Sequence, residues 1–535
     1  FSAFIVSNLE MSKKHAQLGF MSPYVWMFIS SYEKLRDFLL NEKTITSLIQ
    51  LEYSGFEGAT VPICTYTIEN SYLPNFKGSY IRLSDFRGAN NQATKTLEAI
   101  RNPDCGWYYT APGADFNKIP GSPIAYWVPS YFLEIFNVEK NIDDIAPPRI
   151  GMMTTDNDRF LRYWFEIHYN RIGFNYSSLN EAIESNTKWF PYNKGGIFRK
   201  WAGNSELVVN WFKGGKEIKE SGMKSFRGKD YYFKSGITWG DVSSAIFSCR
   251  YTSNGKIFDI KGTSCFPESS DMYIIMSILN SKIGTYILKF LNPTISFQSG
   301  DIRRVPIPYN KLNYSLPRKS VQKMVDLAMS DWDSYEISWN FTIAPLLSPA
   351  HKEQALVSTY SNLNFHWNQT TQEMKRLEEE NNRIFIKAYG LQDELTPEVP
   401  LEEITLTCNP YYRYGGNKSE EELEALLRAD TMKELISYAI GCMMGRYSLD
   451  EPGLIYAHSG NEGFDPSRYQ TFPADEDGII PVMDEDWFAD DATNRFVEFI
   501  KVAWPPETLD ENLKFVADSL GPKKSEEPID TIRRY

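Results

Sequence analysis

The sequence predicts an α/β and α+β multidomain protein with four successive parts. Its 535 residues are enough for about three or four domains. Hydrophobic residues make up 42% of the chain and charged residues 23%, as in ordinary globular proteins, so we expect packed cores. The apolar pattern changes along the chain, which separates an α/β part, a mixed α+β part, a helical spacer and a C-terminal domain.

The first part, residues 1–75, alternates helix and strand patterns. "GFMSPYVWMF" is an apolar run, "SSYEKLRDFLL" is an amphipathic helix with Leu35, Phe38 and Leu39 on one side, and "ITSLIQLEY" and "ATVPICTYTIE" are β-rich. This alternation predicts the parallel sheet of an α/β domain. Because the chain opens in mid-pattern on Phe1, we expect only the second half of that domain here and an upstream part elsewhere.

The other three parts differ in their local patterns. Residues 76–310 contain short β-branched and aromatic runs, many glycine turns and one clear helix over 271–291, which predicts a mixed α+β module. Residues 311–400 are rich in helix formers and predict a helical spacer. Residues 401–535 combine a helix with an acidic, Pro- and Asp-rich stretch and form the predicted C-terminal domain.

Cysteines and histidines follow neither a disulfide nor a metal-binding pattern. The six cysteines are scattered without a C-x-x-C pair, and the five histidines are isolated. No apolar run reaches the ~18 residues of a membrane span. We therefore expect reduced thiols in a cytoplasmic protein, with no metal site and no membrane contact.

Motifs for hydrolytic or phosphoryl-transfer chemistry are absent from the sequence. It contains no G-x-S-x-G elbow, no H-E-x-x-H helix and no P-loop. The carboxylates of Asp331, Asp333 and Glu336 in "DWDSYE" are close enough to suggest a metal or nuclease site. The flanking aromatic residues instead favour a helix start packed by aromatic rings, so we assign these carboxylates no catalytic role.

Charge is distributed unevenly along this acidic chain. The formal net charge is −13, yet the segment from Lys188 to Arg304 holds 18 Lys and Arg against nine Asp and Glu. That local balance of +9 leaves −22 for the remainder. One basic segment inside an acidic protein indicates a localised anionic partner or a solvated positive face.

Cations and aromatic residues alternate within that basic segment. In "KWFPYNKGGIFRKWAGN" four cationic side chains lie among Trp and Tyr rings around a Gly-Gly turn. Cations neutralise phosphates, and planar rings with glycine let a loop approach a groove or stack on a base. The pattern therefore favours nucleic-acid contact, with the solvated positive face as the alternative.

Several stretches together resemble one known family. They include "GFMSPYVWMFISSYEKLRDFLL", "IPGSPIAYWVPSYFLEIF", "GMMTTDNDRFLRYWFEI", "WFPYNKGGIFRKWAGN", "ILKFLNPTISFQSGDIRRVPIP" and "ISYAIGCMMGRYSLDEPGLIYA". The chain resembles the large adenine-specific DNA methyltransferases of the BREX phage-defence system, the PglX family, over nearly its whole length. In that family a Rossmann-like methyltransferase core precedes a target recognition domain and a helical C-terminal region.

The resemblance implies a site-specific adenine-N6 DNA methyltransferase that uses S-adenosyl-L-methionine. It implies the C-terminal half of the Rossmann-like methyltransferase sheet in residues 1–75 and the target recognition domain in 76–310. The expected partners are double-stranded DNA and other BREX defence proteins. Cofactor binding and catalysis are expected in the missing upstream part, so this chain alone is expected to be inactive.

Two motifs that such an enzyme needs are not found in this chain. A glycine-rich loop after a buried strand is missing, and the doublets at 195–196, 214–215 and 415–416 favour turns. The string Asn409-Pro410-Tyr411-Tyr412 lacks the second proline of an Asn-Pro-Pro-Tyr loop and lies far downstream, so a structural turn is the better interpretation. We therefore assign no catalytic and no cofactor-binding residue.

The resemblance makes DNA contact the favoured role of the basic segment. In "TTDNDR", Thr154, Thr155 and Asn157, together with Asp156 and Arg159, are candidates for reading base edges, while capping is the alternative for Asp156 and Asp158. The predicted DNA-binding residues are Thr154, Thr155, Asn157, Arg159, Lys188, Tyr192, Lys194, Arg199, Lys200, Trp201, Lys224, Arg227, Arg250, Arg303 and Arg304.

Two alternative functions remain open at this stage. The first is a non-enzymatic DNA specificity subunit that lends target recognition to a separate modification subunit. The second is a combined restriction and modification enzyme, which would need an N-terminal nuclease motif. The sequence upstream of Phe1 would discriminate among them.

Overall fold

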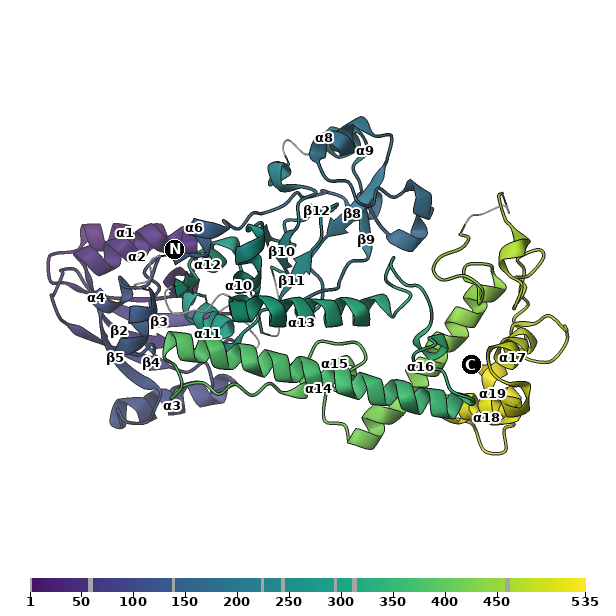
Figure 1. Ribbon diagram of the computed structural model, residues 1–535. Coiled ribbons are helices and arrows are strands. Elements are labelled where there is room, and N and C mark those ends of the chain that lie inside the picture. Colours follow the sequence, from purple (N-terminus) through teal and green to yellow (C-terminus); the bar gives the residue numbers. More distant parts are fainter. Residues whose placement is uncertain are drawn as a thin grey trace.

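The computed structural model describes residues 2–55, 61–136, 140–222, 226–241, 246–292, 296–309, 315–457 and 462–535. The described chain contains four β-sheets and forms an elongated molecule (Figure 1). The N-terminal sheet lies at one end, the C-terminal helices lie at the other, and a small β-rich lobe projects from the middle. This mixed α+β organisation in several sheets confirms the coarse fold prediction.

The N-terminal sheet has five strands in the order β1-β3-β2-β4-β5. The strands are β1 (Gln17–Pro23), β2 (Thr44–Gln50), β3 (Ile63–Glu69), β4 (Lys77–Arg82) and β5 (Tyr108–Pro112). Only β2 and β4 pair in parallel, and the other three strand pairs are antiparallel. The prediction of a parallel sheet is therefore wrong for most of this sheet, because β3 returns beside β2 without a crossover helix. The sheet also continues past the predicted boundary at residue 75.

Three helices flank this sheet and help to build its core. They are α1 (Ser2–Met11), α2 (Glu33–Glu42) and α3 (Ala89–Arg101), with the single-turn α4 (Gly113–Phe116) after β5. Leu35 and Leu39 of α2 are buried, as their spacing predicts. Arg36 on the same helix is also buried, and its guanidinium donates to the carbonyls of Gly121, Trp26 and Ile29. Three backbone acceptors thus compensate one buried cation.

The small lobe is a four-stranded sheet, β12-β8-β9-β7, with three short helices. Its elements are α7 (Asn157–Phe160), β7 (Leu161–Tyr163), α8 (Leu179–Glu184), β8 (Trp189–Asn193), β9 (Leu207–Asn210), α9 (Phe212–Glu220) and β12 (Ile257–Phe258). Phe160, Phe190, Trp211 and Phe258 belong to its own hydrophobic core. The many aromatic side chains of this stretch therefore form the interior of the lobe. Its cations lie at the surface of the lobe or at its base.

Two further small sheets connect the lobe to the rest of the molecule. A three-stranded sheet joins β10 (Gly236–Trp239), β11 (Cys249–Thr252) and β13 (Ser264–Cys265), and a two-stranded one joins β6 (Lys140–Asn141) and β14 (Pro306–Ile307). The single-turn helices α5 (Ser130–Leu133) and α6 (Ile142–Ile145) lie near β6. The β10 sheet packs into the largest core, not into the core of the lobe.

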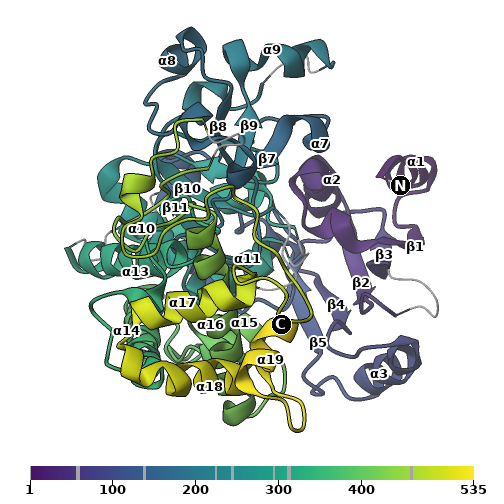
Figure 2. The same cartoon turned by 90° about the vertical axis from the view of Figure 1, so that its right-hand side faces the viewer.

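Helices form the remainder of the molecule and share one large core. They are α10 (Ser269–Leu279), α11 (Lys282–Leu291), α12 (Ser299–Arg303), α13 (Ser315–Asp333), α14 (Leu356–Tyr389), α15 (Pro410–Tyr414), α16 (Glu420–Met443), α17 (Ala492–Ala503), α18 (Leu509–Leu520) and α19 (Pro528–Arg534). Figure 2 shows α14, α16 and α18 beneath the small lobe, and α18 contacts both other helices. The stretch predicted as a helical spacer is helical, and its helices α13 and α14 bury apolar side chains in this core.

The cysteines are free, as the sequence analysis expects. All six cysteines are free thiols, and five of them are buried. Among the described helices, none alone has the length and hydropathy of a membrane span. One pair bent by 75°, Ser269–Leu279 with Lys282–Leu291, meets the length and composition criteria together.

A close backbone approach in the N-terminal sheet gives a first test of the fold. A Cβ on Gly78 would lie 2.6 Å from the Ile45 carbonyl oxygen, so Gly78→Ala forces β2 and β4 apart. We expect this variant to lose about 1–3 kcal/mol of unfolding free energy in urea titrations. Gly19→Ala is the matched control, since nothing lies within 4 Å of a Cβ there. Equal midpoints for the two variants would contradict this strand pairing.

Candidate nucleic-acid interface

The structure divides the predicted DNA-binding residues by their burial. Five are exposed, six are buried, Lys194 is half-buried, Arg303 and Arg304 are partly buried, and Lys224 lies outside the described residues. The exposed five are Thr155, Asn157, Arg159, Lys188 and Arg227. The buried six are Thr154, Tyr192, Arg199, Lys200, Trp201 and Arg250.

Arg199 is buried in an ion pair between the small lobe and α13. Its guanidinium lies 3.2 Å from the Asp331 carboxylate, and both side chains are about 3% exposed or less. The same guanidinium donates to the Thr407 hydroxyl, and Asp331 also accepts from the backbone amides of Thr407 and Cys408. Asp331 is thus committed to a structural contact, and "DWDSYE" ends α13 where the sequence analysis predicts a helix start.

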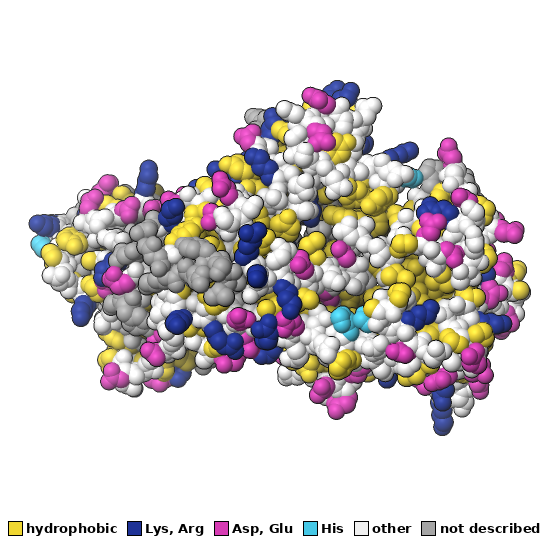
Figure 3. Space-filling view, viewed as in Figure 1, with side chains coloured by type: hydrophobic (Ala, Val, Ile, Leu, Met, Phe, Trp, Pro, Cys, Tyr) yellow, Lys and Arg dark blue, Asp and Glu magenta, His cyan; other side chains and the backbone are white. Residues whose placement is uncertain are grey.

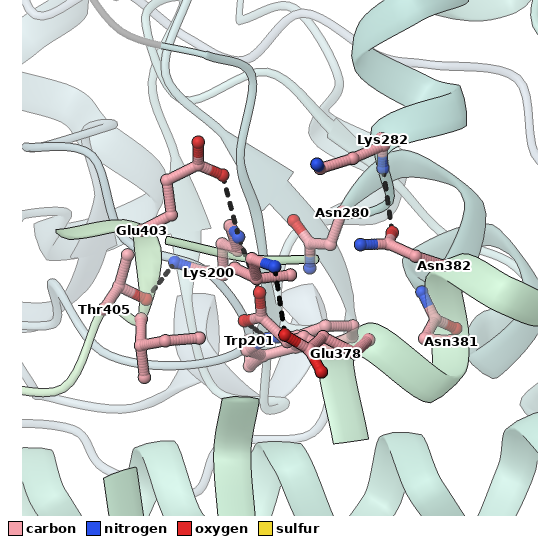
Figure 4. A network of polar contacts seen from close by, with 12 residues as sticks. Lys200, Trp201, Asn280, Lys282, Glu378, Asn381, Asn382, Glu403 and Thr405 are labelled. Carbon is pink, nitrogen blue, oxygen red and sulfur yellow. Dashed lines mark hydrogen bonds and ion pairs between the residues drawn. The ribbon is translucent and has the colours of Figure 1, made fainter. Parts of the chain in front are cut away.

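Lys200 and Trp201 reach α14 through a shared carboxylate (Figure 4). The Lys200 ammonium lies 2.7 Å from one oxygen of Glu378, and the Trp201 indole donates to the other oxygen at 2.7 Å. Lys200 and Glu378 are each 3% exposed. We call the buried pairs Arg199–Asp331 and Lys200–Glu378 the ionic anchor, because they fix one loop of the lobe onto two long helices.

Arg250 holds the turn that precedes the ionic anchor. Its guanidinium donates to the carbonyl oxygens of Gly195 at 2.7 Å and Arg199 at 3.4 Å. Burial lowers the pKa of Arg250 to about 10. Gly195 and Gly196 have φ angles of +95° and +112°, a region that L side chains rarely adopt, so the doublet is the predicted turn.

Tyr192 and Thr154 are also engaged inside the lobe. The Tyr192 hydroxyl donates to Asp259 at 2.6 Å, and burial raises the pKa of that carboxyl group. The Thr154 hydroxyl donates to Asn157 at 2.6 Å. Burial also lowers the pKa of Lys194, while the charge of Asp259 raises it. Together with the ionic anchor and the contacts of Trp201 and Arg250, these hydrogen bonds give all six buried side chains a structural role.

The segment from Thr155 to Arg159 presents three of the predicted side chains to solvent. Asp156 caps α7 by accepting from the Arg159 amide at 3.0 Å, which confirms the capping interpretation for this residue. Thr155 has a φ of +68°, and its hydroxyl lies 3.2 Å from Ser221 at the end of α9. Asn157 and Arg159 are exposed beside this contact. A capped turn therefore holds an amide and a guanidinium on one surface.

Arg303 and Arg304 both make structural contacts through their guanidinium groups. Arg303 pairs with Asp143 at 3.4 Å and donates to the Pro148 carbonyl at 3.1 Å. Arg304 pairs with Asp301 at 2.8 Å and donates to the Pro120 carbonyl at 2.9 Å. These contacts join α12 to the loops after the N-terminal sheet.

The lobe carries more exposed cations than the sequence analysis assigned. Lys188 is 46% exposed and lies 3.5 Å from Glu217, while Lys216 and Lys261 are 65% and 58% exposed. Further exposed cations on the same lobe are Lys213, Lys219, Lys229 and Lys234. The net positive charge of the segment indicates that such cations exist. Only the fold shows which of their side chains reach solvent.

The residues considered for catalysis in the sequence analysis make structural contacts. Asn409 caps α15, and its amide donates to the carbonyls of Leu401 and Ile404 at 2.8 Å each, so the structural turn is confirmed. Asp333 accepts from Ser338 at 2.5 Å. Within the described chain, no three His, Cys, Asp or Glu side chains are grouped to hold a metal ion.

Comparison with known proteins shows what the chain resembles. The model of the Eco57I restriction-modification methylase family matches residues 1–56. The adenine-specific methyltransferase BrxX of Escherichia coli O9:H4 (strain HS) is 36% identical over 552 residues, and the adenine-specific methyltransferase PglX of Lacticaseibacillus casei (strain Zhang) is 34% identical over 553 residues. Both matches cover 100% of this chain, which spans 44% of each relative. The resemblance inferred from the sequence is thereby confirmed.

Two solved structures show a looser likeness. The type IIL restriction-modification enzyme MmeI in complex with DNA gives a TM-score of 0.39 at 13% identity, covering 74% of this chain and 49% of that chain. A nuclease-deletion mutant of the type ISP enzyme LlaGI with a DNA substrate mimic gives 0.39 at 10% identity, covering 66% and 32%. At these scores the likeness adds nothing to the description of the site.

The ionic anchor makes a prediction about stability. Glu378→Ala removes the acceptor of the Trp201 indole and leaves the buried Lys200 ammonium only the Glu403 carboxylate at 3.9 Å. We therefore expect a loss of about 3–5 kcal/mol of unfolding free energy in denaturant titrations. Lys323→Ala is the control, because its partner Glu373 lies 2.5 Å away but Lys323 is 54% exposed. That exposed pair should contribute no more than about 1 kcal/mol. If Glu378→Ala loses no more unfolding free energy than Lys323→Ala, the ionic anchor does not stabilise the fold.

Proposed function

We propose that this chain is the target-recognition portion of a site-specific adenine-N6 DNA methyltransferase of the BREX type. In this proposal the small lobe contacts the duplex and selects the sequence. The remaining length of the enzyme binds S-adenosyl-L-methionine and performs the transfer. The observation that carries the proposal is the match of the entire chain to one portion of two adenine-specific methyltransferases.

The N-terminal sheet is the part that we assign to the methyltransferase core. β1 and β2 are both antiparallel to β3, so they run in the same direction and are joined through α2. A strand, helix and codirectional strand form the repeating unit of Rossmann-like sheets. The Eco57I methylase match over residues 1–56 covers β1, α2 and β2 and supports this assignment. β1 lies at the edge of the sheet, where further strands of a Rossmann-like core would pair.

The described residues do not fit S-adenosyl-L-methionine. Such a cofactor needs a glycine-rich turn between a buried strand and a helix, where backbone amides can approach it. Gly195-Gly196 is held by Arg250, and a Cβ at Gly215 would meet Trp211 and Phe226 at 2.7 Å. Gly415-Gly416 follows the short α15. We therefore place the cofactor outside the described residues and derive no catalytic step here.

The exposed side chains of the small lobe suit the chemistry of duplex recognition. Lys188 and Arg227 offer cations to phosphates, which carry affinity without sequence information. Arg159 and Asn157 are of the side-chain types that bind guanine and adenine edges in the major groove through paired hydrogen bonds. The ionic anchor would hold these groups rigidly against the rest of the enzyme.

The proposed division of labour can be tested with methyl transfer. We expect the 535-residue chain with S-adenosyl-L-methionine to leave DNA unmethylated, because the described residues hold no site for the cofactor. A protein that covers the full length of the relatives should produce N6-methyladenine, measured by mass spectrometry of digested DNA. Methylation by this chain alone would contradict the proposal. Absence of methylation by the longer protein would favour a specificity subunit.

The proposed DNA-binding role of the lobe can be tested with variants that replace only its exposed cations. Replacing Arg159, Lys188 and Arg227 with Ala should weaken duplex binding and reduce the salt slope by up to ~0.9 for each phosphate that is no longer neutralised. Fluorescence anisotropy of a labelled duplex at several salt concentrations measures both. The control replaces Lys514, Lys523 and Lys524, three exposed cations near the C-terminus. An equal loss in the control set would show that the lobe is not the DNA-binding surface.

A further inference from the structure

An apolar groove lies between the small lobe and the C-terminal helices. One wall comes from the 3-10 turn Trp164–Glu166 and the other from residues that follow α16. The charged side chains of the lining are Glu336, Arg446 and Asp477, so one cation lies among two carboxylates. Figure 3 shows hydrophobic side chains gathered in the hollow between these two parts. None of the exposed residues assigned to DNA contact, Thr155, Asn157, Arg159, Lys188 and Arg227, lines this groove.

The walls of this groove expose large apolar side chains. Phe165 is 57% exposed, Met444 is 43% exposed and Ile337 is 39% exposed. The rings of Phe165 and Tyr163 stack at 5.3 Å, and the Trp164 indole donates to the Ile337 carbonyl at 2.8 Å. The groove is therefore a built feature with a fixed wall, and contiguous apolar surface of this kind marks interaction sites.

The chain that leaves the groove at Gly478 exposes a second apolar set. Ile479 is 69% exposed, Val482 82%, Trp487 68% and Phe488 48%. This stretch, which we call the acidic segment, runs over 475–491 without helix or strand. The acidic segment lines the groove at Asp477 and Gly478 and then carries exposed apolar side chains toward α17.

Negative charge surrounds these apolar side chains. The acidic segment contains eight Asp and Glu and no Lys or Arg. Among the described residues, ion pairs reach only Asp486, at 3.8 Å, and Asp491, both from Arg533. The other six carboxylates of the acidic segment therefore have no cation among the described residues within 4.0 Å. A partner that brings both apolar side chains and cations would be complementary to this surface.

We infer that the groove and the acidic segment together bind a cationic, amphipathic segment of a partner protein. Its apolar face would cover Phe165, Met444 and Trp487, and its Lys or Arg side chains would meet the acidic carboxylates. DNA is disfavoured here, because its phosphates would face like charges. The inference does not depend on the proposed methyltransferase role.

A labelled amphipathic peptide of leucine and lysine tests this surface by fluorescence anisotropy on the 535-residue chain. We expect saturable binding that weakens with salt and falls at least about tenfold in Trp487→Ser/Phe488→Ser, as for hot-spot aromatics. The matched control, Leu97→Ser/Ile100→Ser, removes two side chains on α3 that are 46% and 60% exposed. It should bind the peptide like the unchanged chain.

A variant with fewer carboxylates separates the electrostatic contribution to peptide binding from the apolar contribution. Asp484→Asn/Glu485→Gln/Asp490→Asn keeps the shape of the segment and should flatten the salt dependence. A peptide with glutamate in place of lysine should not bind. Equal binding of the glutamate peptide, unchanged binding in both variants, or displacement of the lysine peptide by an unlabelled DNA duplex would overturn the inference. Circular dichroism of each variant confirms that the fold is retained.

Discussion

The ionic anchor is the constraint on which the arrangement of this molecule depends. Arg199–Asp331 and Lys200–Glu378 cross from one loop of the small lobe to α13 and α14, and all four side chains are almost fully buried. Buried charges are costly unless each has its partner. A position of the lobe that separates either pair is therefore disfavoured, and Arg250 holds the loop that carries both cations.

This constraint separates the cations of the lobe into two groups. Those in the loop after β8 form the interior of the molecule, while Arg159, Lys188 and Arg227 stay in solvent. A solvent-exposed cation keeps its charge available to phosphates, whereas a buried one has already exchanged water for protein partners. The proposed recognition of DNA therefore rests on fewer residues than the composition of the segment suggests, but on ones held by a rigid base.

The same rigidity extends to the far end of the molecule. One hydrophobic core runs from the β10 sheet through α14 to α18, so this sheet, the long helices and the C-terminal helices are packed together, and Trp201 brings the loop of the lobe into the same core. The apolar groove and the acidic segment border this core without being covered by it. Duplex contact and protein contact would then use different residues of one body, since none of the exposed side chains assigned to DNA lines the groove.

The sequence by itself determined the coarse mixed fold, the reduced cysteines, the turn at Asn409 and the basic character of the segment from Lys188 to Arg304. Each of these follows from local pattern or composition. Tertiary structure alone decided that Arg199 and Lys200 are buried, because their partners Asp331 and Glu378 lie far along the chain and no local pattern pairs them. The same holds for Arg250, whose acceptors are the backbone carbonyls of Gly195 and Arg199. It also decided the antiparallel return of β3, since strand direction depends on how the connection folds back and not on the apolar pattern of the strand.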